Sequence, residues 1–99
     1  MLTQTYKAFD NDEYTITLEF SGTCIFVHCD VHKFSKSVVY KIILATELIK
    51  RWFLICGVDE LFMYTKNSKF ANLVIGDTQL IDIIYYEGEE YEVLLWELM

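Results

Sequence analysis

Cysteine and histidine residues recur at a regular spacing in one apolar stretch of the sequence. Cys24, His28 and His32 all fall on even positions, so an extended strand over Thr23–Val31 would point the first two to the same side. Zn²⁺ is bound by such side chains when four of them converge. A strand, however, separates residues four apart by roughly 13 Å. We therefore expect no metal site here, and instead a hydrogen-bonded histidine among apolar neighbours.

The same stretch contains two cysteine–histidine pairs that could perform nucleophilic chemistry, Cys29 with His32 and Cys24 with His28. A thiol becomes a nucleophile when a nearby base or cation lowers its pKa. Of the two thiols, only Cys29 is closely followed by such groups. The third cysteine, Cys56, also lies in an apolar stretch, and an odd number of cysteines does not suit a disulfide framework. We expect three buried, reduced thiols in a cytoplasmic protein.

Glutamates and aromatic residues gather near the C-terminus. Glu87-Gly88 separates two apolar runs and predicts a hairpin over Gln79–Leu98. Carboxylates at its tip are expected to be solvated rather than to act as an acid–base pair. Tyrosine and tryptophan within a charged rim are typical interface anchors, and an apolar final strand could also pair in a homodimer. The expected partner-binding residues are Tyr86, Glu87, Glu89, Glu90, Tyr91, Glu92 and Trp96.

The overall composition limits the partners of the chain. Its 99 residues are 54% hydrophobic and carry a formal net charge of −7, which predicts a single globular domain over residues 1–99. Direct nucleic-acid binding is not expected, because phosphate binding needs a basic surface. No apolar run approaches the roughly 20 residues that cross a bilayer, and no secretory signal is evident. We therefore expect a cytoplasmic protein without membrane contact.

A long helix between Ser35 and Gly57 is expected to position these groups. Ser35 or Ser37 can cap its start, and Gly57 can take the left-handed conformation that ends a helix. Alternating steps of four and three residues predict one buried face. That face comprises Val38, Ile42, Ala45, Ile49, Trp52 and Cys56, and is widened by Ile43, Leu44, Leu48, Phe53 and Ile55.

The other expected elements are mostly strands. Alternation predicts a strand over Tyr14–Phe20, joined through a tight turn at Ser21-Gly22 to an interior strand over Thr23–Val31 that is covered on both faces. After the long helix we expect a parallel strand, a short helix and a hairpin. The strand is expected over Glu60–Thr65, and the two strands of the hairpin over Gln79–Tyr86 and Glu89–Leu98. The short helix is expected over Lys69–Ile75, ended by Gly76-Asp77, and its buried residues are expected to be Phe70, Leu73 and Val74. Met1–Asp12 is hard to place, with Tyr6 and Phe9 as anchors of a short first strand.

The resulting order, ββ-α-β-α-ββ, predicts an α+β domain with a mixed sheet. From Thr23 to Leu98 it resembles the C-terminal half of the GNAT-type acetyltransferase superfamily. Val58-Asp59-Glu60-Leu61 resembles the family's entry to the strand after the long helix, and Asn67-Ser68-Lys69-Phe70-Ala71 its Asn-led short helix. The resemblance implies that acetyl-CoA would bind at the start of the long helix. It also implies a V-shaped opening between the two parallel strands, which would hold the pantetheine arm of the cofactor.

The chain departs from this family where chemistry would occur. The family has a Gln/Arg-x-x-Gly-x-Gly/Ala loop whose amides hold the pyrophosphate, whereas Val31–Val39 contains no glycine. The tyrosine that serves the family as general acid would align near Val74 or Ile75, so no catalytic residue is expected. Such short relatives are commonly phage-encoded, which would place this chain in the cytoplasm of a host cell. Should acetyl-CoA bind, the resemblance implies contacts with Ser35, Lys36, Ser37, Val38, Val39 and Asn67.

Three functional hypotheses follow. The first is a GNAT-like protein without acetyltransferase activity or cofactor, which binds another protein through its acidic, aromatic hairpin. The second is a divergent acetyl-CoA-dependent N-acyltransferase. The third is an acidic decoy that inhibits a nucleic-acid-binding protein of the host. This hypothesis is based on the net charge of −7.

Overall fold

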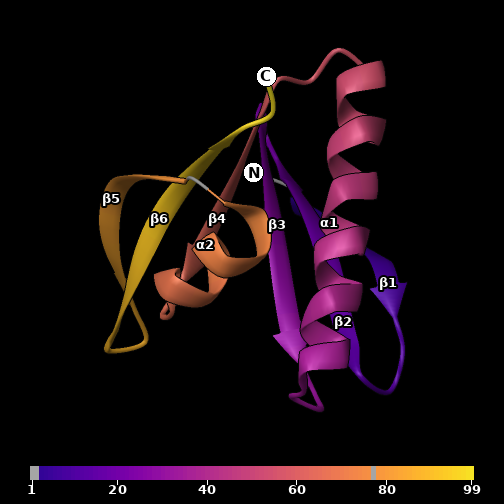
Figure 1. Ribbon diagram of the computed structural model, residues 1–99. Coiled ribbons are helices and arrows are strands. Elements are labelled where there is room, and N and C mark those ends of the chain that lie inside the picture. The colour runs from indigo at the N-terminus through magenta and orange to yellow at the C-terminus, as the bar shows by residue number, and fades with distance from the viewer. Residues whose placement is uncertain (1–2, 77) are drawn as a thin grey trace.

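A computed structural model describes residues 3–76 and 78–99 and shows an α+β domain with a mixed sheet, as predicted (Figure 1). Its strands are β1 (Thr3–Asp10), β2 (Tyr14–Ser21), β3 (Cys24–Val31), β4 (Glu60–Thr65), β5 (Gln79–Tyr86) and β6 (Glu89–Glu97). Its helices are α1 (Lys36–Ile55) and α2 (Ser68–Ile75). Among the described residues there is therefore one strand more than the predicted order contains.

The additional strand is β1, which pairs antiparallel with β2 over its whole length. Of its side chains only Phe9 is half-buried, and the others are exposed. A strand that buries so little has no clear alternation in its sequence, which explains why only a short strand was expected there. The ring of Tyr6 packs edge-on against Phe20, with the two centroids 5.7 Å apart.

The sheet has the order β1-β2-β3-β4-β6-β5. β3 and β4 are parallel, as the strand–helix–strand pattern predicts, and the other neighbouring strands are antiparallel. β3 and β4 pair at one position, Phe26 with Phe62. Beyond it the two strands separate towards their carboxyl ends (Figure 1). β6 lies between β4 and β5, so the final strand has no free edge for the predicted dimer, and β5 occupies the edge instead.

Both helices lie on one face of the sheet (Figure 1). The core lies between them and the inward residues of β2, β3, β4 and β6, which include Ile16, Val27, Leu61 and Leu94. The other face carries no described helix. The prediction that β3 is covered on both faces is therefore wrong. A right-handed crossover from β3 to β4, followed by another in the same direction from β4 to β5, places both helices on the same side.

The helix α1 begins and ends close to the predicted residues. Ser35 is its N-cap, with its hydroxyl accepting from the Val38 amide at 3.2 Å, and Gly57 takes a φ of 86° just beyond the C-cap Cys56. Its buried residues are Val38, Ile42, Ala45, Thr46, Ile49 and Phe53. The predicted face was too wide, because the sheet reaches only one side of the helix. Leu44, Leu48, Trp52, Ile55 and Cys56 are exposed, Trp52 by 55%.

The short helix α2 is capped by Asn67, as predicted, with Oδ1 accepting from the Phe70 amide at 3.1 Å. Ala71 and Val74 are buried against the core, whereas Leu73 is exposed and its predicted burial is wrong. Ala71 and Val74 are three residues apart and share one side of the helix, from which Leu73 is rotated away. Gly76 is the C-cap of the helix, and Asp77 lies outside the described residues.

Candidate functional site

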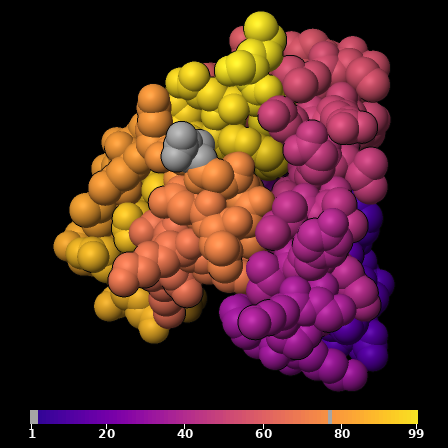
Figure 2. All heavy atoms as spheres, in the orientation of Figure 1, coloured from indigo at the N-terminus to yellow at the C-terminus, as the bar shows by residue number. Residues whose placement is uncertain are grey.

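A cavity of about 560 Å³ lies where β3 and β4 separate. We call it the β3–β4 slot. Because successive residues of a strand point to opposite faces, the slot is lined from both faces of the sheet. Val27, Cys29 and Met63 line it on the face that carries the helices, and His28 and Tyr64 line it on the open face. Figure 2 shows the surface hollowed between the start of α1 and the region of α2 and the C-terminal hairpin.

The wall on the helix side is apolar. Phe70, Ala71 and Val74 of α2 and Ile42 of α1 contribute to it. The one buried hydroxyl there, on Thr46, donates to the Ile43 carbonyl at 2.8 Å, so it needs no other partner. Such a wall suits a slender apolar ligand rather than a charged one.

The thiol of Cys29 lies in this wall, but it is not an activated nucleophile. Burial, and to a lesser extent the negative charge of Asp30, raise its pKa to about 11. The predicted partner His32 is bonded elsewhere, with Nε2 2.8 Å from Thr15 Oγ1. Because the Thr15 hydroxyl donates to Asp10 Oδ1 at 3.0 Å, His32 Nε2 is the donor in its bond with Thr15. Cys24 and Cys29 are half-buried and Cys56 is exposed, so the prediction of three buried thiols is wrong.

On the open face, His28 and Tyr64 line the slot, and both contact Glu19 of the neighbouring strand β2, which does not line it. His28 Nε2 lies 3.0 Å from Glu19 Oε1, and the Tyr64 hydroxyl lies 3.2 Å from the same oxygen. Burial and the nearby Glu19 carboxylate raise the pKa of Tyr64, so this phenol stays protonated and donates. Aromatic rings surround the cluster, with His28 and Tyr64 at 4.4 Å and His28 stacked on Phe26 at 6.3 Å between centroids.

Sequence reasoning missed Glu19 and Tyr64 altogether. The signal for Glu19 was present but misread. With the expected turn at Ser21-Gly22, Glu19 would pair with Cys24. The observed loop is Gly22-Thr23, so Glu19 pairs with Phe26 and lies diagonally across from His28. A turn displaced by one residue moved the register by two.

Only one of the six residues expected to contact acetyl-CoA, Asn67, lines the slot. Ser35 uses its hydroxyl as a cap, and Val38 is buried in the core with 1% exposure. Lys36 and Ser37 are exposed in the first turn of α1. The mouth of the slot is nevertheless close, because Phe34, just before α1, packs on Phe70 of α2 with centroids 6.0 Å apart.

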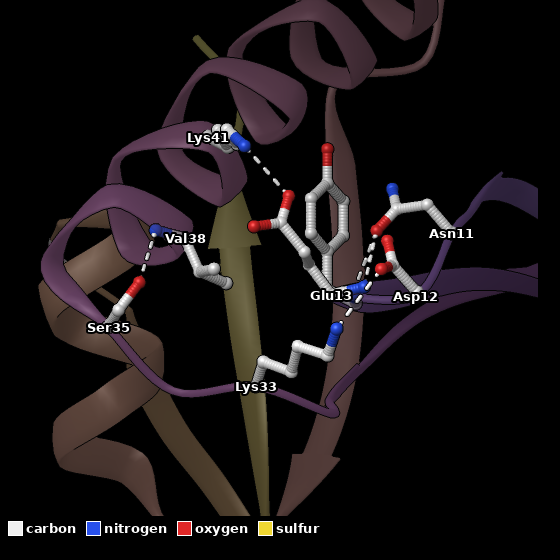
Figure 3. Close-up of polar contacts among 8 residues, drawn as sticks. Asn11, Asp12, Glu13, Lys33, Ser35, Val38 and Lys41 are labelled. Atoms are coloured by element: carbon white, nitrogen blue, oxygen red, sulfur yellow. Dashed lines mark hydrogen bonds and ion pairs between the residues drawn. The ribbon is translucent and has the colours of Figure 1, made fainter.

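The lysines near the start of α1 are largely neutralised by the turn between β1 and β2 (Figure 3). Lys41 Nζ lies 2.7 Å from Glu13 Oε1, and Lys33 Nζ lies 3.1 Å from Asp12 Oδ2. The hydrogen bond and the charge of Lys33 lower the pKa of Asp12, and those of Glu13 raise the pKa of Lys41. Among the described lysines near the start of α1, Lys36 has no ion pair and remains available to an anionic ligand.

The C-terminal hairpin differs from the predicted docking surface. Trp96 is 5% exposed and belongs to the core, so its prediction as a partner-binding residue is wrong. Strand alternation directs it to the helices together with Leu94. Of the tyrosines, Tyr91 is half-buried against Tyr64, with centroids 6.0 Å apart, and Tyr86 is 62% exposed.

The glutamates of this hairpin mostly have local partners. Glu89 pairs with Lys66, whose hydrogen bond and charge lower the pKa of Glu89. Glu90 accepts from the Tyr85 hydroxyl at 2.9 Å, and Glu92 accepts from the Ser68 hydroxyl at 3.2 Å. Among these three glutamates, the charge of Glu89 is therefore offset by a cation, whereas Glu90 and Glu92 keep theirs.

Within residues 3–76 and 78–99, no three histidine, cysteine or acidic side chains are grouped to hold a metal ion. No helix in the same part of the chain has the length and apolar character needed to cross a membrane. No protein-family model matches the chain, and no curated protein or solved structure matches it either.

Proposed function

We propose that the protein is a GNAT-like domain that binds acetyl-CoA as a divergent acyltransferase, with the pantetheine arm in the β3–β4 slot. One observation carries the proposal: two adjacent parallel strands pair at a single position and leave a cavity of about 560 Å³ between them. The order of elements supports it, since β3 leads into a long helix, a parallel strand, an Asn-capped short helix and a hairpin.

The backbone of the slot suits such an arm. Beyond Phe26 and Phe62, the facing edges of β3 and β4 are not paired with each other. Their amides and carbonyls can bind a ligand that itself contains amides, as a peptide binds to a strand edge. The pantetheine arm has two amide groups on a slender chain, whereas the apolar wall around Phe70 and Val74 would receive its methyl and methylene groups.

The phosphates of the cofactor would lie at the start of α1. Val38 is capped by Ser35, which leaves the amides of Lys36 and Ser37 at the positive end of the helix dipole. The Lys36 ammonium would add a charge. Without a glycine loop the backbone cannot surround the pyrophosphate closely, so we expect micromolar rather than tighter binding.

Calorimetric titration with acetyl-CoA tests this proposal. Micromolar binding is expected for the wild type, with a loss of at least tenfold for Lys36→Glu. Ala71→Phe should abolish binding, because Ala71 lines the slot and is 9% exposed. Lys50→Glu near the opposite end of α1 is the matched charge control and should bind like the wild type. No binding of acetyl-CoA at millimolar concentration would refute the proposal.

A second function, binding of a protein partner at the hairpin, is favoured by the exposed edge strand β5. Leu80, Ile81 and Ile83 of this strand are 46–54% exposed, and an uncovered apolar edge can pair with another strand. Sedimentation of the wild type and of Ile83→Lys measures self-association through this edge. If instead a host protein is captured and high salt releases it, the acidic-decoy hypothesis gains support.

A further inference from the structure

Glu19, His28 and Tyr64 have the geometry of an oriented base. A carboxylate only accepts hydrogen bonds, so the proton between His28 and Glu19 lies on His28 Nε2, and in the neutral form of the ring Nδ1 carries the lone pair. A carboxylate that holds one nitrogen of an imidazole fixes the tautomer and leaves the other nitrogen free to take a proton. Among the described residues, none forms a hydrogen bond with His28 Nδ1.

The surroundings hold this ring in place without closing it off. Phe26 stacks nearly parallel to it, at an interplanar angle of 3°, and the Tyr64 ring packs against it at a tilt of 59°, with the two centroids 4.4 Å apart. The side chains of His28 and Glu19 are 21% and 22% exposed. At this degree of burial the ring is partly sheltered from bulk water and remains accessible to a ligand, and His28 is among the residues that line the slot.

We infer that His28 is the general base of acyl transfer and that the acceptor enters from the open face of the sheet. This inference rests on the proposed function. His28 Nδ1 takes the proton from the attacking nitrogen or oxygen of the acceptor. The new bond to the acyl carbon forms as the carbon–sulfur bond breaks, and the proton passes from His28 to the departing thiolate of CoA. Glu19 acts through His28 and is a positioning residue.

The two histidines of the chain provide a matched comparison. Both donate Nε2–H to an oxygen on β2, His28 to Glu19 and His32 to Thr15. Only His28 lines the slot. If His28 had only a structural role, replacing either histidine should have a similar effect on thiol release. If His28 is the base, only its replacement should reduce thiol release.

The first experiment measures acetyl-CoA binding by calorimetry and thiol release from acetyl-CoA with ethylamine as the acceptor. His28→Gln should still bind acetyl-CoA, because its side chain remains polar and of similar size, and should lose thiol release by about 10²-fold or more. His32→Gln should keep acetyl-CoA binding and thiol release within about twofold of the wild type, because His32 takes no part in proton transfer. Circular dichroism confirms that both variants are folded.

The outcomes separate the inference from the proposed function. Binding by the wild type with equal thiol release from His28→Gln, or with no thiol release at all, overturns the inference and leaves cofactor binding intact. A wild type that does not bind acetyl-CoA overturns the proposed function, and the inference fails with it.

A second experiment needs no acetyl-CoA. Nitrogen-15 NMR of the imidazole ring should show the Nε2–H tautomer for His28 in the wild type, and a mixture of tautomers in Glu19→Ala. Glu19→Asp should restore part of the preference and part of the thiol release. An Nδ1–H tautomer in the wild type would overturn the inference even if acetyl-CoA binds.

Discussion

The two faces of the sheet are built from neighbouring residues but differ in chemistry. On β3, Val27 faces the helices and is 6% exposed, while His28 faces the open side. On β4, Met63 faces the helices and is 5% exposed, and the next residue, Tyr64, lies on the open side and packs against His28. The face with helices is apolar and mostly buried, and the open face carries half-buried aromatic and titratable groups. One strand thus supports the core with one set of side chains and a candidate reaction site with the other.

This difference has a topological origin. Two right-handed crossovers in the same direction place α1 and α2 on one face. Hydrophobic stabilisation is therefore concentrated on that face. Substitutions on the open face should lower the free energy of unfolding by less.

The largest contrast is expected within the hairpin. Trp96→Ala removes a large side chain from the core and should lower the free energy of unfolding by about 3–5 kcal/mol. Tyr86→Ala, at an exposed position, should change it by less than about 0.5 kcal/mol. Urea unfolding followed by circular dichroism measures both. Equal losses would mean that the hairpin does not divide between core and surface as described.

The helix α1 offers a similar pair. Ile42 is 0% exposed, and its replacement by Ala should cost about 2–5 kcal/mol of unfolding free energy. Leu44→Ala removes an equally apolar side chain that is 52% exposed, so its cost should be below about 1 kcal/mol. A large loss for Leu44→Ala, measured in urea, would show that another surface covers this side of α1.

A smaller effect is expected for the open-face cluster. Tyr64→Phe removes one hydrogen bond to Glu19 and keeps the ring, so the free energy of unfolding should fall by about 1 kcal/mol. The bond between His28 and Glu19 remains in this variant. A loss of several kcal/mol in the urea experiment would make the cluster part of the structural core and would blur the division between the faces.

The thiol groups on β3 provide a pH-dependent test. Burial raises the pKa of Cys29 from 9.0 to about 11, so the unfolded chain ionises this thiol first. The folded state therefore loses stability as pH rises from 9.0 to about 11. Cys29→Ala should lack this part of the loss, and Cys24→Ala, on the open face, should retain it. Urea midpoints at about pH 8 and about pH 10.5 make the comparison.

Much of the fold was predictable from local signals. The N-cap Asn67, the glycine after α1 and the alternation in β2 depend on residues that are close in sequence, and they are as predicted. The N-cap of α1 is Ser35, one of the two serines that were predicted for it. The strand β1 was less predictable, because its side chains are largely exposed and carry no pattern.

The site was predicted less well, because it depends on contacts between distant residues. His28 was singled out with the wrong partners. Its actual partners, Glu19 and Tyr64, lie 9 and 36 positions away along the chain and reach it through strand register. A displacement of one residue in the turn between β2 and β3 would have paired His28 with a different set of side chains.

Apart from β1, the sequence by itself determined which segments form helices and strands, where the helices begin, and that the two strands flanking the long helix are parallel. These follow from side-chain periodicity, caps and the handedness of crossovers, which act locally. Only the tertiary structure decided that β3 and β4 separate after one pair, that Trp96 is in the core, and that Glu19 meets His28. Those outcomes depend on how the sheet twists and which face the helices cover, and no short stretch of residues encodes either.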